Sequence, residues 1–332
     1  MRVSPRHVGR RAVEYGLTFL VAVGINFLLP YLAPGDPLIY VIGPEATELS
    51  PAEREAELAR YGLDEPLHVQ FVEYLLGALR GDLGTSLTFG RPVTEVLAAR
   101  LPWTLLLVGS ALLLAVVFGT LFGAISAWHE GDRTDLGLMS GVVVAMSAPG
   151  FWLGMLFIAV FAAWLGWFPS SGIRSAEAPP TAFGSAIDVA HHLVLPVAAL
   201  TFVRLGNIYL IARNTVLSTL GEDFLLFSRA KGLSDRRVLY GHAVPNSLLP
   251  VYTRFTLQVG VAIGGAVAIE TVFAIPGVGR LLFEAALARD YPLLQGAFLL
   301  LTVTVIAANL VADLTYPLVD PRTGARGPED RP

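Results

Sequence analysis

Apolar residues form six long runs along the chain, and each run is close to the length that a membrane-spanning helix needs. A helix that crosses ~30 Å of hydrocarbon takes about 20 mainly apolar residues. The runs cover approximately residues 12–30, 101–127, 137–163, 193–213, 253–275 and 293–316. The pattern therefore predicts an all-α membrane protein with six transmembrane helices.

The third run is unusual because its apolar character continues to about residue 167, which is too long for one upright helix. Pro149 and Gly150 lie in its middle. We expect a tilted or broken helix, or a re-entrant segment. Glycine pairs four residues apart, which let helices approach closely, recur in the runs and are also common in ordinary membrane helix packing; they are Gly119/Gly123, Gly137/Gly141, Gly150/Gly154 and Gly260/Gly264.

The composition supports a membrane protein and excludes several functions. Hydrophobic residues make up 54% of the chain and charged residues 15%, against about 25% charged in typical soluble domains. A net charge of −4 gives no basic surface for nucleic acid, and the chain contains no cysteine. Lys231, the only lysine, precedes Gly232, so a phosphate-binding loop with its Gly-Lys-Ser/Thr ending is absent. We expect no catalytic residue, cofactor or metal.

Charge asymmetry predicts how the chain is oriented and divided. Residues 1–11 hold four arginines and no acid, which places the N-terminus in the cytoplasm, and six spans return the C-terminal tail, 317–332, to the same side. Span 1, 12–30, lacks a cleavage site after it, so we interpret it as a retained anchor. Residues 101–316 then form a five-span core.

Between spans 1 and 2, residues 31–100 carry five arginines and eleven acids, and we expect an external subdomain there. Ser50, Pro51 and Glu53 combine an N-cap, a first-turn proline and a capping-box acid, and Gly62 can end the helix that they start. The segment is therefore expected to be folded.

The most informative connection is the loop at about 214–252, which we expect on the cytoplasmic side. Acidic residues at 222 and 223 suit a helix N-terminus, Arg229 and Lys231 suit its end, and Gly232 fits the left-handed position after it. Ser234 and Asp235 can start a second short helix. The sequence predicts two helices joined at a glycine corner, with Leu233 exposed near the tip, as a docking site.

In this loop the sequence resembles the membrane permease subunits of binding-protein-dependent ABC importers, in the dipeptide, oligopeptide and nickel branch. The similarity rests on Ser228-Arg229-Ala230-Lys231-Gly232-Leu233-Ser234, followed by Val244-Pro245. It extends through most of the chain, in Pro34-Gly35-Asp36-Pro37, Gly81-Asp82-Leu83-Gly84-Thr85-Ser86, Ser147-Ala148-Pro149-Gly150, Glu270-Thr271-Val272-Phe273, Pro276-Gly277-Val278-Gly279 and Asp320-Pro321-Arg322. The usual acidic-Ala-Ala opening of the loop is replaced by Leu226-Phe227-Ser228.

The resemblance implies a type I ABC importer permease fold in a prokaryotic plasma membrane. It implies a second permease subunit in a heterodimer, two cytoplasmic ATPase subunits and an external substrate-binding protein as partners. Residues 228–235, Ser228 to Asp235, would then form the coupling helix that receives the ATPases. The substrate would be a peptide or a similar small solute, and its identity stays open between dipeptides, oligopeptides, nickel and sugars.

A secondary, ion-coupled transporter is the main alternative. Its evidence would be Arg204, Glu270 and Asp313, because ionisable groups inside spans are often functional. No second half of the chain repeats the first, which argues against this interpretation. An enzyme is a weaker alternative, since His129-Glu130 has Arg133 where a second metal-binding histidine would stand.

Three polar residues of the spans are candidates for the pore or its gate. Arg204 and Asn207 lie within the fourth span, and Glu270 stands shortly before Pro276-Gly277. The alternative for each is a structural role, such as an interhelical hydrogen bond.

Overall fold

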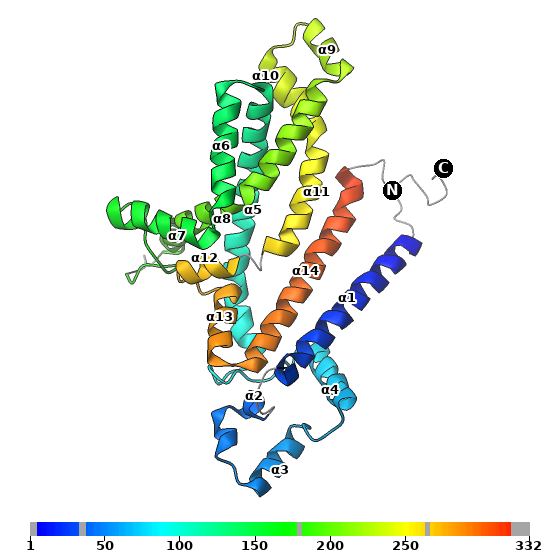
Figure 1. The fold of residues 1–332 in the computed structure, drawn as a ribbon, viewed down its shortest axis with the longest axis vertical. Helices are drawn as coiled ribbons and strands as arrows, with labels where there is room; N and C mark the ends of the chain where they lie inside the picture. The colour runs from blue at the N-terminus through cyan, green and yellow to red at the C-terminus, as the bar shows by residue number, and fades with distance from the viewer. Residues whose placement is uncertain (1–4, 33–37, 178–180, 263–265, 320–332) are drawn as a thin grey trace. The chain divides into compact units, whose positions relative to one another are not determined.

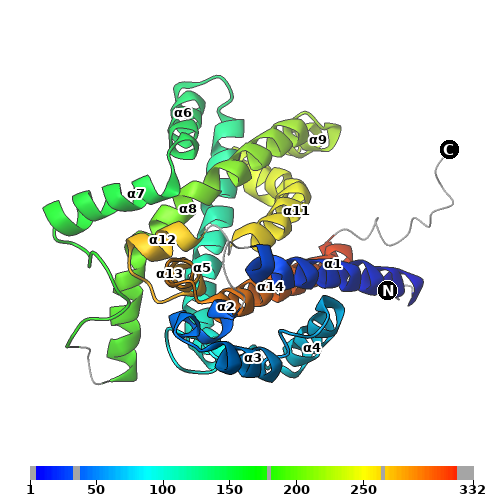
Figure 2. The same cartoon turned by 60° about the horizontal axis from the view of Figure 1, so that its bottom comes forward.

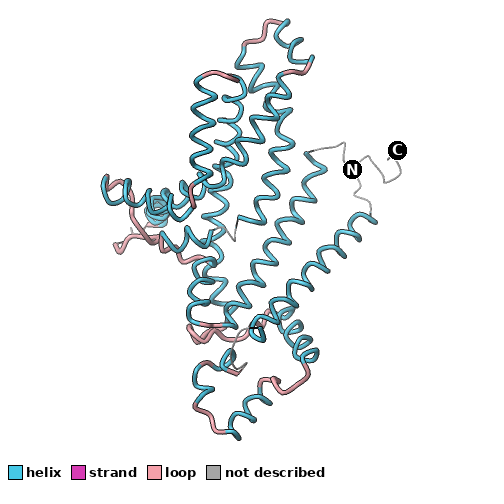
Figure 3. Tube along the Cα trace, in the orientation of Figure 1, coloured by secondary structure: helices cyan, strands magenta, loops and turns pink. Residues whose placement is uncertain are grey.

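The computed structural model describes residues 5–32, 38–177, 181–262 and 266–319. Within these ranges the chain forms helices joined by loops and turns, without a named strand (Figure 3). The predicted C-terminal arginines, the Pro34–Pro37 motif and Gly264 lie outside the described residues.

The helices follow one another through the described residues (Figure 1). The α-helices are α1 (Pro5–Leu32), α2 (Ile39–Ile42), α3 (Pro51–Arg60), α4 (Leu67–Arg80), α5 (Val93–Trp128), α6 (Arg133–Ser147), α7 (Gly150–Phe157), α8 (Ala182–Leu220), α9 (Asp223–Ala230), α10 (Asp235–Val238), α11 (Val244–Ala262), α12 (Val267–Val272), α13 (Val278–Ala288) and α14 (Tyr291–Val319). A 3₁₀ turn covers Pro44–Thr47, and π-helical segments cover Ile158–Trp164 and Leu239–Ala243.

Among the described residues, four helices are long and apolar enough to cross a membrane: α1, α5, α8 and α14. The pair α6 and α7 adds a fifth span if it counts as one, and it is bent by 105°. The break falls at Ala148 and Pro149, because proline at 149 excludes its predecessor from helical backbone angles. The predicted interruption at Pro149-Gly150 is confirmed, and the bent pair is either a broken span or a re-entrant loop. The fifth predicted span, 253–275, corresponds to α11 and α12, and residues 263–265 between these helices lie outside the described part.

The chain forms two compact units, and α5 and α14 contribute residues to both. The first unit comprises residues 1–103 and 276–307, and its helix α3 has the predicted start signals. Ser50 caps α3 in a capping box: its hydroxyl accepts from the Glu53 amide, and its own N–H donates to the Glu53 carboxylate at 2.9 Å. Hydrogen bonds from the Ser50 hydroxyl and amide hold the pKa of Glu53 below its usual value. Gly62 has φ +65° as expected.

In the first unit, Asp290 binds the end of the Gly81–Ser86 motif. Its carboxylate is fully buried and accepts hydrogen bonds from the Ser86 hydroxyl at 2.5 Å and from the Thr88 amide at 2.9 Å. The same carboxylate accepts from the Leu293 amide at 3.1 Å, in the first turn of α14. One buried acid thus fixes the loop before α5 and caps α14.

In the second unit, residues 104–275 and 308–332, helix α8 is central. It contacts α6, α7, α11 and α12 (Figure 2). Of the predicted glycine pairs, Gly119 and Gly123 of α5 pack against it: an added Cβ would lie 2.9 Å from Ile208 Cβ at the first and 2.8 Å from Ala212 Cβ at the second. Nothing lies within 4 Å of such a Cβ at Gly137 or Gly141.

Candidate functional site

The connection between α8 and α11 folds into the two predicted short helices, α9 and α10. Helix α8 continues to Leu220, so the connection is shorter than the predicted 214–252 loop and covers residues 221–243. Gly232 follows α9 with φ +79°, the left-handed conformation predicted for it. Ser234 then precedes α10 in extended conformation, although its side chain makes no capping bond.

The turn after α9 closes with the two hydrogen bonds of a Schellman motif. The Gly232 amide donates to Arg229 O at 2.9 Å, and the Leu233 amide donates to Ser228 O at 3.4 Å. This turn directs Leu233 back toward the protein, where it is half-buried against the apolar cluster described next. The prediction that Leu233 is exposed at the tip is therefore wrong.

An apolar cluster joins the connection to the ends of two long helices. Leu225 of α9, Val238 of α10 and Leu239 pack with Ala127 of α5 and Val216 of α8. Leu225 is 1% exposed and Val238 is completely buried. The cluster therefore packs α9 and α10 against the ends of α5 and α8.

The opposite side of α9 presents large apolar side chains to the surroundings. Leu226 and Phe227 are each 69% exposed, and Phe224 is 42% exposed. Phe224 and Phe227 line a surface hollow together with Asp223, Ser228 and Lys231. In Figure 1 α9 lies at the far end of the second unit, beyond α6 and α10. An exposed apolar patch beside charged groups is typical of a protein interaction surface.

The basic side chains around this surface pack on aromatic rings. The Arg229 guanidinium lies 5.3 Å from the ring centre of Trp128 at the end of α5, and the Lys231 ammonium lies 5.7 Å from the ring centre of Phe227. The first contact ties the end of α9 to α5. Of the predicted coupling residues, Arg229 thus has a contact within the chain, and Ser228 bonds its hydroxyl to Phe224 O at 3.0 Å.

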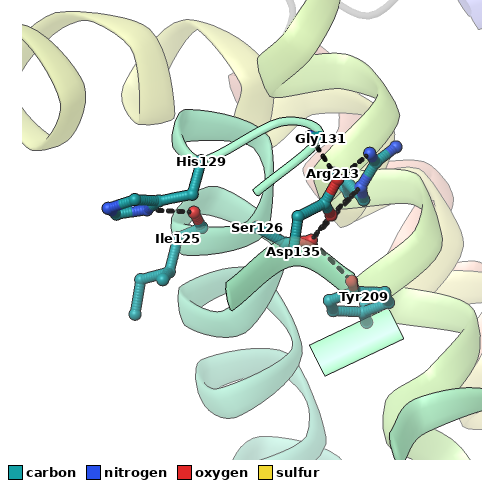
Figure 4. Close-up of polar contacts among 7 residues, drawn as sticks. All are labelled: Ile125, Ser126, His129, Gly131, Asp135, Tyr209 and Arg213. Atoms are coloured by element: carbon teal, nitrogen blue, oxygen red, sulfur yellow. Dashed lines mark hydrogen bonds and ion pairs between the residues drawn. The ribbon is translucent and has the colours of Figure 1, made fainter. Parts of the chain in front are cut away.

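A buried polar network connects side chains of α5, α6 and α8 (Figure 4). Arg213 of α8 binds both carboxylate oxygens of Asp135 of α6, with Nε at 2.8 Å and Nη2 at 2.7 Å. The Gly131 amide, at the turn before α6, donates to Asp135 at 3.1 Å. Ser126 of α5 donates to Asp135 and contacts the Tyr209 hydroxyl at 2.6 Å.

The network is largely buried and joins three helices. Ser126 and Tyr209 are completely buried, Asp135 is 6% exposed, and the Arg213 side chain is 13% exposed. Bidentate arginine–carboxylate pairs have a fixed geometry, and breaking a buried one leaves an uncompensated charge. The network therefore holds α5, α6 and α8 together, and α9 packs on two of these helices, α5 and α8.

The three pore or gate candidates lie elsewhere in the second unit. Glu270 of α12 is completely buried and accepts a hydrogen bond from the Thr104 hydroxyl of α5 at 2.6 Å. Asn207 of α8 accepts a bond of 3.4 Å from Arg254 of α11. Arg204 lies one turn before Asn207 and is half-buried. Glu270 is thus separated from open solvent in this chain, whereas Arg204 and Asn207 are half-exposed.

Comparison with known proteins identifies the family. Residues 119–325 match the family described as binding-protein-dependent transport system inner membrane component. The chain belongs to this family. The match confirms the prediction of a permease and not the alternative of a secondary transporter. It also shows that the chain is a multi-pass membrane protein.

Curated relatives cover nearly the whole permease. It is 36% identical over 299 residues to the oligopeptide transport system permease protein AppB of Bacillus subtilis, covering 90% of this chain and 92% of that protein. It is 38% identical over 320 residues to the di/tripeptide transport system permease protein DppB of Pseudomonas aeruginosa, covering 92% and 94%.

A solved structure supports the predicted permease fold. The MetNI methionine ABC transporter in inward-facing conformations gives a TM-score of 0.55, with 16% sequence identity, over 68% of this chain and 96% of that chain. At this identity the likeness concerns the fold alone.

Sequence reasoning missed the buried network of this permease. Asp135 and Arg213 are charged residues at the edges of the predicted spans 137–163 and 193–213, and that position was a usable signal because charges near spans are usually paired. Their pairing across 78 positions of sequence was not predictable from spacing.

Proposed function

We propose that this permease forms half of a translocation path for peptides or similar small solutes, powered by separate ATPase subunits that dock on α9, Gly232 and α10. The observation that carries the proposal is the two-sided character of α9. Leu225 is buried against α5 and α8, while Leu226 and Phe227 are each 69% exposed. One side is attached to the long helices, and the other is available to a partner.

The substrate class follows from the relatives. One is named as an oligopeptide permease and another as a di/tripeptide permease, and the chain covers more than nine-tenths of each. We therefore propose a peptide substrate, delivered by an external binding protein and passed between this chain and a second, non-identical permease subunit.

Separate subunits are proposed as the source of ATP hydrolysis. The chain has one lysine, and that residue precedes glycine instead of serine or threonine. A phosphate-binding loop cannot be built around it. The mechanical work would then enter through α9 and α10.

Force would reach the spans through contacts within the second unit. Movement of the ATPases shifts α9 and α10, the apolar cluster around Leu225 carries the shift to α5 and α8, and the Asp135–Arg213 pair carries α6 with them. Alternating access requires such bodies to move as units between two states. The coupling exists only if α9 makes different contacts with the two ATPase states.

The orientation proposed for this mechanism places both termini and the α9–α10 connection in the cytoplasm, with residues 31–100 outside. The arginines before residue 12 and the excess of acids in 31–100 support it.

The function can be tested by reconstitution. The permease is co-expressed with the second permease subunit and the ATPase subunits, and the complex is purified. It is then placed in proteoliposomes, and the binding protein is enclosed or added. ATP-dependent accumulation of a labelled tripeptide, and ATP hydrolysis stimulated by the loaded binding protein, are expected. Hydrolysis by the isolated chain, or uptake driven by an ion gradient without ATPase subunits, would contradict the proposal.

A further inference from the structure

Four polar side chains form a strip on the facing sides of α8 and α11. Arg204 and Asn207 belong to α8, and Arg254 and Gln258 belong to α11. Val251 packs against Ile208 and Ala212, which defines the face that α11 turns toward α8. Arg254 and Gln258 follow Val251 at three and seven positions, so they lie on that same face.

The strip lies in the central part of both helices. Asn207 stands 13 residues before the end of α8 at Leu220, and Arg254 stands 10 residues after the start of α11 at Val244. At 1.5 Å per residue these separations correspond to about 20 Å and about 15 Å. Ionisable and amide groups at such depth are costly unless partners or a water-filled path compensate them.

The strip contains polar atoms whose bonding capacity is unused. Gln258 is 5% exposed, yet within the described part of the chain neither its amide nitrogen nor its carbonyl oxygen has a hydrogen-bond partner. Arg254 Nε is likewise buried without a partner among the described residues. The bond of Arg254 Nη2 to Asn207 is long, at 3.4 Å, and the ion pairs of the described residues do not include Arg254.

We propose that this strip is a peptide-binding station on the translocation path, in which Arg254 holds the terminal carboxylate of the transported peptide and Gln258 bonds its backbone amides. The proposal rests on the peptide-permease function above. A guanidinium has the fork of donors that a carboxylate accepts, and a glutamine amide both donates and accepts, as a peptide group does. Arg204 adds positive charge one turn away, on the same helix as Asn207.

This chemistry recognises what all peptides share. The terminal carboxylate and the backbone amide do not depend on side-chain identity, so the station would accept peptides of many sequences. The competing occupant is a polar or acidic side chain of the second permease subunit, which would make the strip an interface. The two occupants make different predictions when Arg254 is changed.

The test measures peptide binding to the purified complex of permeases and ATPases in nanodiscs, without binding protein. Trialanine and trialanine amide are compared by equilibrium dialysis, for the wild type, Arg254→Gln, Arg254→Lys and Gln258→Leu. Arg80→Gln, on the exposed last turn of α4, is the matched arginine control. Subunit composition is checked for every variant.

The wild type should bind trialanine more tightly than its amide. Arg254→Gln should weaken trialanine binding about tenfold and leave binding of the amide unchanged. Arg254→Lys should keep part of the preference for trialanine over its amide. Gln258→Leu should weaken the binding of both ligands. Arg80→Gln should match the wild type. Equal binding of the two ligands by the wild type, an unchanged preference in Arg254→Gln, or loss of the second permease from that variant would overturn the station. Stimulation of ATP hydrolysis by the binding protein, measured on the same wild-type preparation, separately tests the permease function.

Discussion

Gly232 lies in the proposed docking segment and has a backbone conformation that favours glycine. It has φ +79°, and an added Cβ would have nothing within 4 Å of it. The cost of a replacement therefore comes from backbone strain and not from a clash. Residues with a branched Cβ tolerate this conformation poorly, whereas asparagine adopts it more readily.

Replacing Gly232 by valine should uncouple the transporter without unfolding it. The strain is about 1–3 kcal/mol and would open the turn that seats Leu233 and orients α9. We expect Gly232→Val to insert and accumulate normally, yet to lose uptake and binding-protein-stimulated ATP hydrolysis, while Gly232→Asn keeps most of both. Near-normal uptake by Gly232→Val in proteoliposomes would show that the glycine is only a helix stop.

The buried pair Asp135–Arg213 makes a second prediction at this scale. Removing one partner leaves a buried charge uncompensated and typically costs about 3–5 kcal/mol. Asp135→Asn and Arg213→Gln should each lower the thermal stability of the solubilised complex, and the double variant should be less destabilised than the sum of the two. Additive effects would mean that the two side chains do not interact.

Residue-level features differed in how far the sequence could predict them. The Ser50 capping box and the positive φ of Gly232 depend on neighbours in sequence, and both were predicted correctly. The burial of Leu233 was not predicted, because it depends on packing against the apolar cluster that includes residues of α5 and α8. The Asp135–Arg213 pair depends on the packing of α6 against α8, and local sequence patterns do not predict such a contact.

At the scale of the element, the docking proposal rests on the two sides of α9, one buried and one exposed. Leu225 points to the cluster on α5 and α8, and the neighbours Leu226 and Phe227 are exposed. This division follows from the helical repeat of 3.6 residues per turn, because consecutive side chains point in different directions.

Polar replacement of the exposed side should remove the ATPase subunits. We expect Leu226→Ser combined with Phe227→Ser to leave the permease pair intact but to lose the ATPases during purification, since an interface core of large apolar groups supplies most binding energy. Leu79→Ser, on α4, is the control, because Leu79 is 65% exposed but lies in the proposed external segment. Retention of the ATPases by the double variant would place their docking surface elsewhere.

At the scale of the whole molecule, long apolar runs predict the spans, and a single proline predicts the break between α6 and α7. Long apolar runs predicted α1, α5, α8 and α14, and Pro149 predicted the bend between α6 and α7. The predicted span 253–275 includes residues 263–265, which lie outside the described residues, so it stays a prediction. Hydropathy measures preference for lipid and contains no information about where a helix ends inside it.

The orientation of the molecule can be measured with single cysteines, since the chain has none of its own. A cysteine at Ala56 of α3 should react with a membrane-impermeant thiol reagent from outside, and one at Ser234 should react only after the membrane is opened. Both positions are exposed, so access and not burial decides the result. The reverse labelling pattern would contradict the proposed topology.

Cross-linking from α9 tests the central claim most directly. A single cysteine replaces Phe227, which is 69% exposed, and a short reagent that links a thiol to an amine is applied to the assembled transporter, with a cysteine at Ala56 of the proposed external segment as the control. The account predicts a cross-link between residue 227 and an ATPase subunit, with a yield that changes when ATP is bound, and no such product from residue 56. An active, ATP-hydrolysing assembly in which residue 227 reacts with the reagent but never links to an ATPase subunit would contradict it.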